Sequence, residues 1–212
     1  MVAGTIYGVA LNDREHHTQL ASSFEKPPHQ KPPQRPVLYI KPRNCLMGPS
    51  DAIPLPGDLA CLEAASSLGL LIGRDAARIT SRAALDHIAG ACLALDIGEA
   101  DTGFYRPPVR QRCRDGFLRL GEMSKFDPAL LNAELETSVN DRIVHRWSLG
   151  RLVRNAPSLV AEVSSFMTLA AGDVLLVGTP FDAPRVAMGD RVTLRLAQLP
   201  SLSAQIRAEG VP

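Results

Sequence analysis

Four polar residues able to do chemistry stand where apolar segments end or the chain turns. Lys41 follows the apolar run VLYI and precedes Pro42, so its ammonium group is placed to hold a carboxylate or polarise a carbonyl. Asp96 closes the run ACLALDI, where a carboxylate suits a metal ligand or the start of a turn. His16 lies in the polar segment REHHTQ and can move protons near neutral pH, and Thr179 lies in a Gly-Thr-Pro turn. Each residue also has an ordinary interpretation, as a solvated strand end, a turn cap, a surface histidine or a tight turn.

The widespread catalytic and nucleotide-binding motifs do not occur in this sequence. It contains no P-loop, no G-x-G-x-x-G, no G-x-S-x-G and no H-E-x-x-H. The cysteines are far apart and have no C-x-x-C spacing, which argues against a zinc ribbon or a redox dithiol and favours reduced, mostly buried thiols. They are Cys45, Cys61, Cys92 and Cys113.

The composition is that of a globular protein without an electrostatic affinity for nucleic acid. Of the 212 residues, 45% are apolar and 21% are charged, and the formal net charge is +1. The N-terminus has no signal-peptide pattern, and no apolar run approaches the roughly 20 residues that span a bilayer. We therefore expect a cytoplasmic protein that binds neither nucleic acid nor membranes. The length predicts one domain over 1–212, with an N-terminal strand and Pro-rich connector in 1–36 and the core in 37–212.

Most of the predicted elements are short strands. Asn140 and Asp141 interrupt ELETSVNDRIVHRW and predict a hairpin turn. The segment DAIPLPGD, 51–58, is rich in proline and is expected to be irregular. Further strands are predicted at 4–11, 37–40, 67–73 and 91–97, and after the Gly-Asp pairs of AGDVLLVGTP and MGDRVTLRL.

Two helices are predicted from their end signals. The first covers 80–90 and ends at a glycine, and the second begins after the cap residue Asn155 with Pro157 in its first turn. Because the strands do not alternate regularly with helices, we expect a β-rich α+β fold and not a doubly wound parallel sheet. The expected apolar face of the second helix consists of Leu159, Val160, Val163, Phe166 and Met167.

Seven short segments occur together in the order typical of the fumarylacetoacetate hydrolase family. They are YIKPRN…GP, AALDHIAG, ALDIGEAD, RDGFLRLG, VNDRIVH, LAAGDVLLVGTP and MGDRV. The chain resembles this family over nearly its whole length, which implies a mixed β-sheet roll with a few short helices. Within the family, GTIYGVALN, FYRPPVRQRCRDGF and GTPFDAPRVAMGDRV are similar to the N-terminal half or subunit of the bifunctional isomerase/decarboxylases of 4-hydroxyphenylacetate (homoprotocatechuate) degradation.

The resemblance implies an enzyme that acts on small dicarboxylic keto-enol acids. Members of this subgroup decarboxylate 5-oxopent-3-ene-1,2,5-tricarboxylate and isomerise 2-hydroxyhepta-2,4-diene-1,7-dioate. It also implies a homodimer, or a heteromer with a paralogous C-terminal-type subunit. An alternative hypothesis is a catalytically silent, metal-free partner of a metal-bearing paralogue.

The family holds Mg²⁺ or Mn²⁺ on two glutamates of an E-x-E strand and on an aspartate of a following strand. The aspartate corresponds to Asp96, but the glutamates correspond to Ala65 and Ser67. Glu63 lies two residues before Ala65 and cannot replace two ligands. A lone carboxylate lacks the charge needed to offset dehydration of the ion. We therefore predict that Asp96 is a vestigial ligand and that this chain binds the metal weakly or not at all.

The resemblance also assigns roles to other residues. The orienting carboxylate that accompanies His16 in the family is replaced by Gln19, which argues against an acylpyruvate-type hydrolase. The family's lysine before the R-D-G turn is Arg112, and its arginine after the aspartate is Ala100. The implied catalytic residues are Lys41, His16 and Asp115, and the implied substrate-binding residues are Arg43, Arg112, Arg114 and Thr179.

Overall fold

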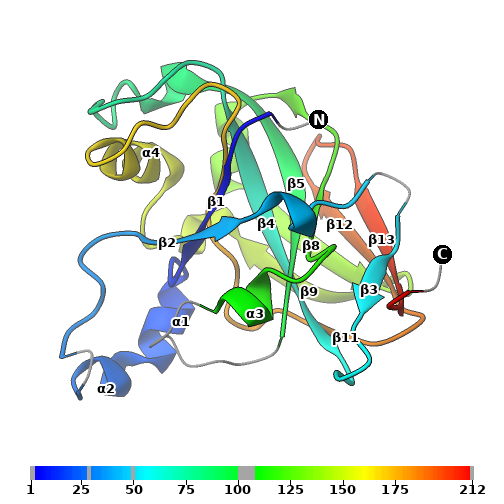
Figure 1. The fold of residues 1–212 in the computed structure, drawn as a ribbon. Coiled ribbons are helices and arrows are strands. Elements are labelled where there is room, and N and C mark those ends of the chain that lie inside the picture. Colours follow the sequence, from blue (N-terminus) through cyan, green and yellow to red (C-terminus); the bar gives the residue numbers. More distant parts are fainter. Residues whose placement is uncertain (1–2, 28–29, 49–50, 100–107, 211–212) are drawn as a thin grey trace.

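Two β-sheets form the fold in the computed structural model, which describes residues 3–27, 30–48, 51–99 and 108–210 (Figure 1). The larger sheet has two short strands that lie off its main path, β11 (Arg185–Val186) beside β4 and β7 (Ser124–Lys125) beside β5. Its main path runs in the order β2 (Val37–Lys41), β1 (Ile6–Ala10), β10 (Val174–Leu176), β4 (Leu62–Ile72), β5 (Ile88–Gly98) and β6 (Leu118–Leu120). The smaller sheet has the order β3 (Ile53–Leu55), β13 (Leu202–Ala208), β12 (Arg191–Leu196), β8 (Glu134–Val139) and β9 (Arg142–Ser148).

The helices are short and lie around the two sheets (Figure 1). Among the described residues, no helix is long and apolar enough to cross a membrane. The α-helices are α1 (Arg14–Gln19), α2 (Ala21–Phe24), α3 (Val109–Arg112) and α4 (Ala156–Ser164). The 3₁₀ helices are η1 (Arg43–Cys45), η2 (Ala84–His87), η3 (Pro128–Asn132) and η4 (Leu149–Arg151). This β-rich α+β architecture confirms the expected fold class.

The larger sheet is curled because the chain after β2 returns to the opposite end of the strand order. Lys41 at the end of β2 pairs with Ile6 of β1. After η1, Leu46 forms a parallel bridge with Leu118 of β6, and the Met47 amide donates to the Leu118 carbonyl at 3.0 Å. The two end strands are thus brought together, and one face of the sheet is enclosed as in a roll.

Side-chain alternation along β5 separates two environments. Leu93 and Leu95 belong to the main hydrophobic core that also takes in the inner faces of the smaller sheet and of α4. Ala94 points to the enclosed side of the roll and belongs to a smaller apolar cluster. Asp96 shares that side with Ala94, so its carboxylate is placed among apolar neighbours and must be neutralised there.

Two predictions of local structure are wrong. The segment 51–58 contains β3, which pairs in parallel with β13 through Ile53 opposite Ile206. Pro54 is tolerated because β3 is an edge strand, where the missing N–H costs no ladder bond. The segment 80–90 forms only η2, and from Ile88 onward the chain joins β5 because the long strand β4 offers it a pairing partner.

The second helix and the hairpin are confirmed, with one exception. The Asn155 side chain caps α4 by accepting a hydrogen bond from the Ser158 amide at 3.0 Å. Asn140 and Asp141 both have positive φ, 50° and 64°, as the tight turn between β8 and β9 requires. Phe166 does not belong to the apolar face, because α4 ends at residue 164 and its ring is 63% exposed.

Candidate active site

Asp96 lies at the centre of a buried ionic cluster. Tyr39 and Lys41 reach it from β2, and Arg112 approaches from the end of α3. Glu63 on β4 completes the group by pairing with Arg112. We call Tyr39, Lys41, Glu63, Asp96 and Arg112 the Asp96 cluster. It holds two cations and two carboxylates, so its charges balance internally.

Lys41 is fully enclosed by acceptors. Its Nζ lies 2.6 Å from Asp96 Oδ1, and both side chains are 0% exposed. Its three N–H donors reach the carbonyls of Ile97, Arg112 and Phe117 at 3.0, 2.6 and 2.9 Å. Asp96 Oδ1 accepts no hydrogen bond from the described residues, so its contact with Lys41 is an ion pair without a hydrogen bond. Lys41 therefore holds β2 against the ends of β5 and α3 and does not face an open cleft.

Tyr39 supplies the second contact to the carboxylate. Its hydroxyl donates a hydrogen bond to Asp96 Oδ2. Burial, followed by the charge of Asp96, raises the pKa of Tyr39 well above 10.0, so the phenol remains a donor at neutral pH. Gly8 pairs with Tyr39 across β1 and β2, and a Cβ at Gly8 would lie 2.0 Å from the Tyr39 ring. The absence of a side chain at Gly8 thus lets the ring lie over β1.

Arg112 and Glu63 form the outer part of the cluster. The Arg112 Nη2 lies 3.0 Å from Glu63 Oε1, and the two side chains are 25% and 18% exposed. Burial raises the pKa of Glu63, and the charge of Arg112 opposes this shift. Burial lowers the pKa of the Arg112 guanidinium. The negative charges of Asp96 and Glu63 raise it and have the larger combined effect, so the pKa is raised overall. Arg112 is more accessible than Lys41 and is the cluster's better placed cation for an anionic ligand.

The residues that the resemblance places at the family's metal position do not fit a divalent cation. Ala65 lies directly opposite Asp96 in the register of β4 and β5. The Ser67 hydroxyl is engaged, because it donates a 2.6 Å hydrogen bond to the Gly178 carbonyl. In the part of the chain that the structure describes, no group of three or more His, Cys, Asp or Glu side chains is arranged to hold a metal ion. Mg²⁺ and Mn²⁺ need oxygen ligands with carboxylate charge, and here Lys41 already compensates the charge of Asp96 while Arg112 pairs with Glu63.

His16 lies on α1, within electrostatic reach of Arg112. Its ring packs against Phe181 with the centroids 5.9 Å apart. Burial lowers the pKa of His16 below 6.5, and the charges of His17 and Arg112 lower it further against the opposing charge of Asp13. The imidazole is therefore neutral at pH 7 and can accept a proton.

Thr179 is positioned by the turn that ends β10. Gly178 has φ +135°, a conformation that other residues rarely adopt. The Ser67 hydroxyl ties this turn to β4, and the Asn12 side chain donates to the Val177 carbonyl at 2.7 Å. The turn is thus fixed beside β4, the strand that carries Ala65 and Ser67.

Three of the predicted site residues lie in other surroundings. Arg43 is exposed on η1, and Asp115 is exposed and accepts a 2.7 Å hydrogen bond from Asn44 Nδ2. Arg114 is within 2.9 Å of two carboxylates outside the Asp96 cluster. The structure therefore brings together Lys41, Asp96 and Arg112, but not these three. Ala100 lies outside the described residues.

Tyr39 and the role of Glu63 did not emerge from the sequence. Tyr39 precedes Lys41 by two residues and so shares its face of the strand, which is the one local signal that pointed to it. The pairing of Glu63 with Arg112 joins residues 49 positions apart and depends on the packing of α3 against β5, whose end pairs with Glu63 at the start of β4.

A second ion pair, between Asp13 and Arg151, fixes the start of α1, the helix that carries His16. Asp13 caps α1 through the Glu15 amide at 3.1 Å, accepts from the Phe181 amide at 3.1 Å, and pairs with Arg151. Burial raises the pKa of Asp13. The hydrogen bonds, of which that from Arg151 has the largest effect, lower it by more in total, so the pKa of Asp13 lies below 3.8. The contribution of the carboxylate to the free energy of unfolding is therefore present above pH 3.8 and is lost as the pH falls through the lower folded-state pKa.

Replacing Asp13 with asparagine is expected to weaken this acid dependence. The variant should be less stable than the parent at pH 7, and the difference should shrink as the pH falls below about 4. Urea unfolding from pH 7 to pH 2 measures this. Arg151→Gln should cost a similar amount, and the double variant little more, because both changes remove one pair. A difference that stays constant with pH would contradict the assignment.

The comparisons with known proteins agree on one family. The family model for fumarylacetoacetate (FAA) hydrolase, C-terminal, matches residues 5–207. The 4-hydroxyphenylacetate degradation bifunctional isomerase/decarboxylase of Salmonella dublin is 36% identical over 206 residues, which are 97% of this chain and 48% of that protein. The chain thus spans about half the length of the curated relatives it matches first.

Solved structures show the same fold. 5-Carboxymethyl-2-hydroxymuconate delta-isomerase from Mycobacterium smegmatis has a TM-score of 0.83 and 26% identity, covering all of this chain and 81% of the other. Fumarylpyruvate hydrolase from Pseudomonas aeruginosa, solved with Mn²⁺ and pyruvate, has a TM-score of 0.80 and 20% identity, covering 97% and 90%. At that lower identity the similarity extends to the fold alone.

Proposed function

Since the chain belongs to the fumarylacetoacetate hydrolase family, we propose that it is a subunit of an isomerase/decarboxylase of 4-hydroxyphenylacetate degradation. The observation that carries this proposal is the 36% identity to such an enzyme over 97% of the chain. Its substrates would be the tricarboxylate and the dienoate named above, both small acids with several carboxylates. We also propose that it is cytoplasmic and works as a homodimer or with a paralogous C-terminal-type subunit.

In this proposal the reaction is supported by charges of the protein itself. Arg112 is the accessible cation that would hold a substrate carboxylate, and Thr179 would bind beside it. His16, neutral at pH 7, would move the proton that isomerisation requires. Lys41 is enclosed and would not touch the substrate, but its positive charge near the end of β5 would stabilise negative charge on the substrate through space. The roles of Arg43, Arg114 and Asp115 would need a different arrangement of their loops.

A second candidate function is a catalytically silent, metal-free partner of a metal-bearing paralogue. A specific observation favours it: the Asp96 carboxylate is held by Lys41 and Tyr39, while Ala65 and Ser67 occupy the ligand positions. In this case the chain would complete or stabilise the paralogue's site. In both candidates Mg²⁺ or Mn²⁺ would bind this chain weakly or not at all.

Turnover of the dienoate by the purified chain distinguishes the two candidates. If the chain is itself catalytic, we expect activity that survives EDTA and falls at least about tenfold in Arg112→Gln, the loss of one charge-assisted contact. Arg110→Gln is the matched control, because this arginine of the same helix is 66% exposed and pairs with the exposed carboxylate of Asp58. Activity that appears only after the paralogue is added, and that Arg112→Gln leaves unchanged, would instead support the silent partner. Full activity of the chain alone that requires Mg²⁺ would contradict both.

A further inference from the structure

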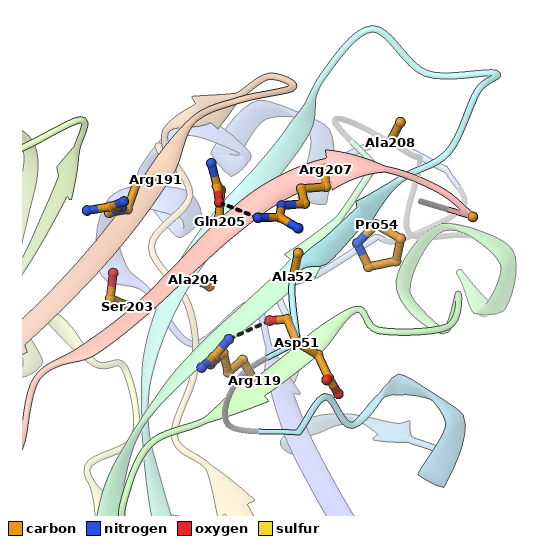
Figure 2. A pocket seen from close by; sticks show the side chains of 11 residues that line it. Asp51, Ala52, Pro54, Arg119, Arg191, Ser203, Ala204, Gln205, Arg207 and Ala208 are labelled. Atoms are coloured by element: carbon orange, nitrogen blue, oxygen red, sulfur yellow. Dashed lines mark hydrogen bonds between the residues drawn. The ribbon is translucent and has the colours of Figure 1, made fainter. Parts of the chain in front are cut away.

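A polar cleft of about 450 Å³ lies where the edges of the two sheets meet (Figure 2). Its walls come from β3, β6, β12 and β13. Three arginines, Arg119, Arg191 and Arg207, line it together with one carboxylate, that of Asp51. The charged side chains therefore give the cleft an excess of positive charge.

Arg119 is the fixed cation of the cleft. It is only 8% exposed, and its Nη1 donates a 2.7 Å hydrogen bond to the Asp51 carbonyl, as Figure 2 shows. Burial lowers the pKa of Arg119, and the charge of Asp51 opposes this shift. A second negative charge in the cleft would further favour the charged guanidinium.

Arg191 and Arg207 are the exposed cations and lie on neighbouring strands. Arg191 is directly opposite Gln205 in the register of β12 and β13, and the Arg207 Nη2 donates to Gln205 Oε1 at 3.3 Å. Both side chains are exposed, and neither arginine forms an ion pair with a carboxylate of the described residues. Two other arginines of the same sheet, Arg146 and Arg195, are 3.0 and 3.8 Å from Glu136. The charges of Arg191 and Arg207 are thus left for a ligand.

The cleft is separated from the Asp96 cluster by the larger sheet. In the register of β5 and β6, Asp96 pairs with Leu118 and Leu95 pairs with Arg119. Successive side chains of a strand point to opposite faces. Arg119 and Asp96 therefore lie on opposite faces of the sheet, and a ligand of the cleft would not occupy the enclosed site.

We propose that this cleft is a second binding site, for a small oxyanion that carries at least two negative charges on carboxylate or phosphate groups. Guanidinium groups match the oxygen pairs of both anions and can bind them through two parallel hydrogen bonds. Arg119 adds a buried positive charge to the lining, and Arg191 and Arg207 present exposed guanidinium groups from the smaller sheet. The single carboxylate of Asp51 disfavours monoanions, because they leave fewer charge-assisted contacts to offset its repulsion.

Calorimetric titration of the full chain at constant ionic strength tests the proposal. The probes are inorganic phosphate, citrate, and acetate as the monoanion. We expect phosphate or citrate to bind with acetate at least about tenfold weaker. Arg191→Gln and Arg207→Gln should each weaken binding about tenfold or more, as the loss of one charge-assisted contact predicts.

Arg195→Gln is the matched control, since Arg195 is an exposed arginine on the same face of β12 as Arg191 but outside the cleft. It should change the affinity less than twofold. Both test residues are exposed, and circular dichroism verifies that each variant is folded. Binding of citrate alone would identify a polycarboxylate ligand, and binding of phosphate alone a phosphate ligand; either supports the proposal. No binding of either anion, or equal weakening by Arg195→Gln, would overturn it.

Discussion

Replacing Lys41 with methionine is expected to lower the free energy of unfolding by about 3–5 kcal/mol. The change leaves the Asp96 carboxylate buried without its cation, and it leaves the carbonyls of Ile97, Arg112 and Phe117 without a donor. Unpartnered buried charge is among the most destabilising defects that a single substitution can introduce. Urea unfolding of the parent and the variant at pH 7 measures the difference.

Arg146→Met is the matched control for Lys41→Met. Arg146 pairs with Glu136 on the surface, where its side chain is 53% exposed, so its loss should cost less than about 1 kcal/mol. A double variant, Lys41→Met with Asp96→Leu, should be more stable than the sum of the single changes predicts, because it removes both charges. A cost of Lys41→Met no larger than that of Arg146→Met would show that Asp96 is not held as described.

Replacing Trp147 with alanine is expected to destabilise the chain by about 3–5 kcal/mol. Trp147 is 1% exposed on β9 and packs in the main core between the sheets. Its Nε1 donates to the Ser66 hydroxyl of β4 at 3.1 Å, so this side chain joins the two sheets by apolar contact and by a hydrogen bond. Thermal or urea unfolding measures the loss.

Two control variants separate these contributions. Trp147→Phe keeps most of the buried apolar area and should cost about 1–2 kcal/mol, mainly from the lost hydrogen bond. Phe166→Ala removes an aromatic ring that is 63% exposed and should change stability by less than about 0.5 kcal/mol. A loss in Trp147→Ala as small as that in Phe166→Ala would mean that the contact between the sheets carries little of the stability.

Much of the fold follows from local pattern, and the errors have local causes. The hairpin at Asn140 and the cap at Asn155 are encoded within a few residues, so both were predictable. The strand β3 was not, because its pairing partner β13 lies about 150 residues further on and outweighs the proline at position 54. The extension of β5 back to Ile88 likewise depends on the length of β4, which alternation alone did not give.

The candidate site was accessible to sequence reasoning only in part. Lys41 and Asp96 lie at or near strand ends, and the sequence has Ala65 and Ser67 where the family resemblance predicts glutamates. The sequence could not show that Lys41 turns inward onto Asp96, because this depends on the curl that brings β2 to β5. The arginine cleft was not predictable for a similar reason, since β3, β6 and the pair β12–β13 that line it are far apart in the chain.

The internal neutralisation of Asp96 also constrains how this lineage can change. A glutamate at position 65 would place a second carboxylate directly opposite Asp96, and one at position 67 would break the bond to the Gly178 turn. Either single step would yield a less stable ancestor or descendant than the present chain. Introducing carboxylates at these two positions should therefore require paired replacements or prior stabilising changes elsewhere.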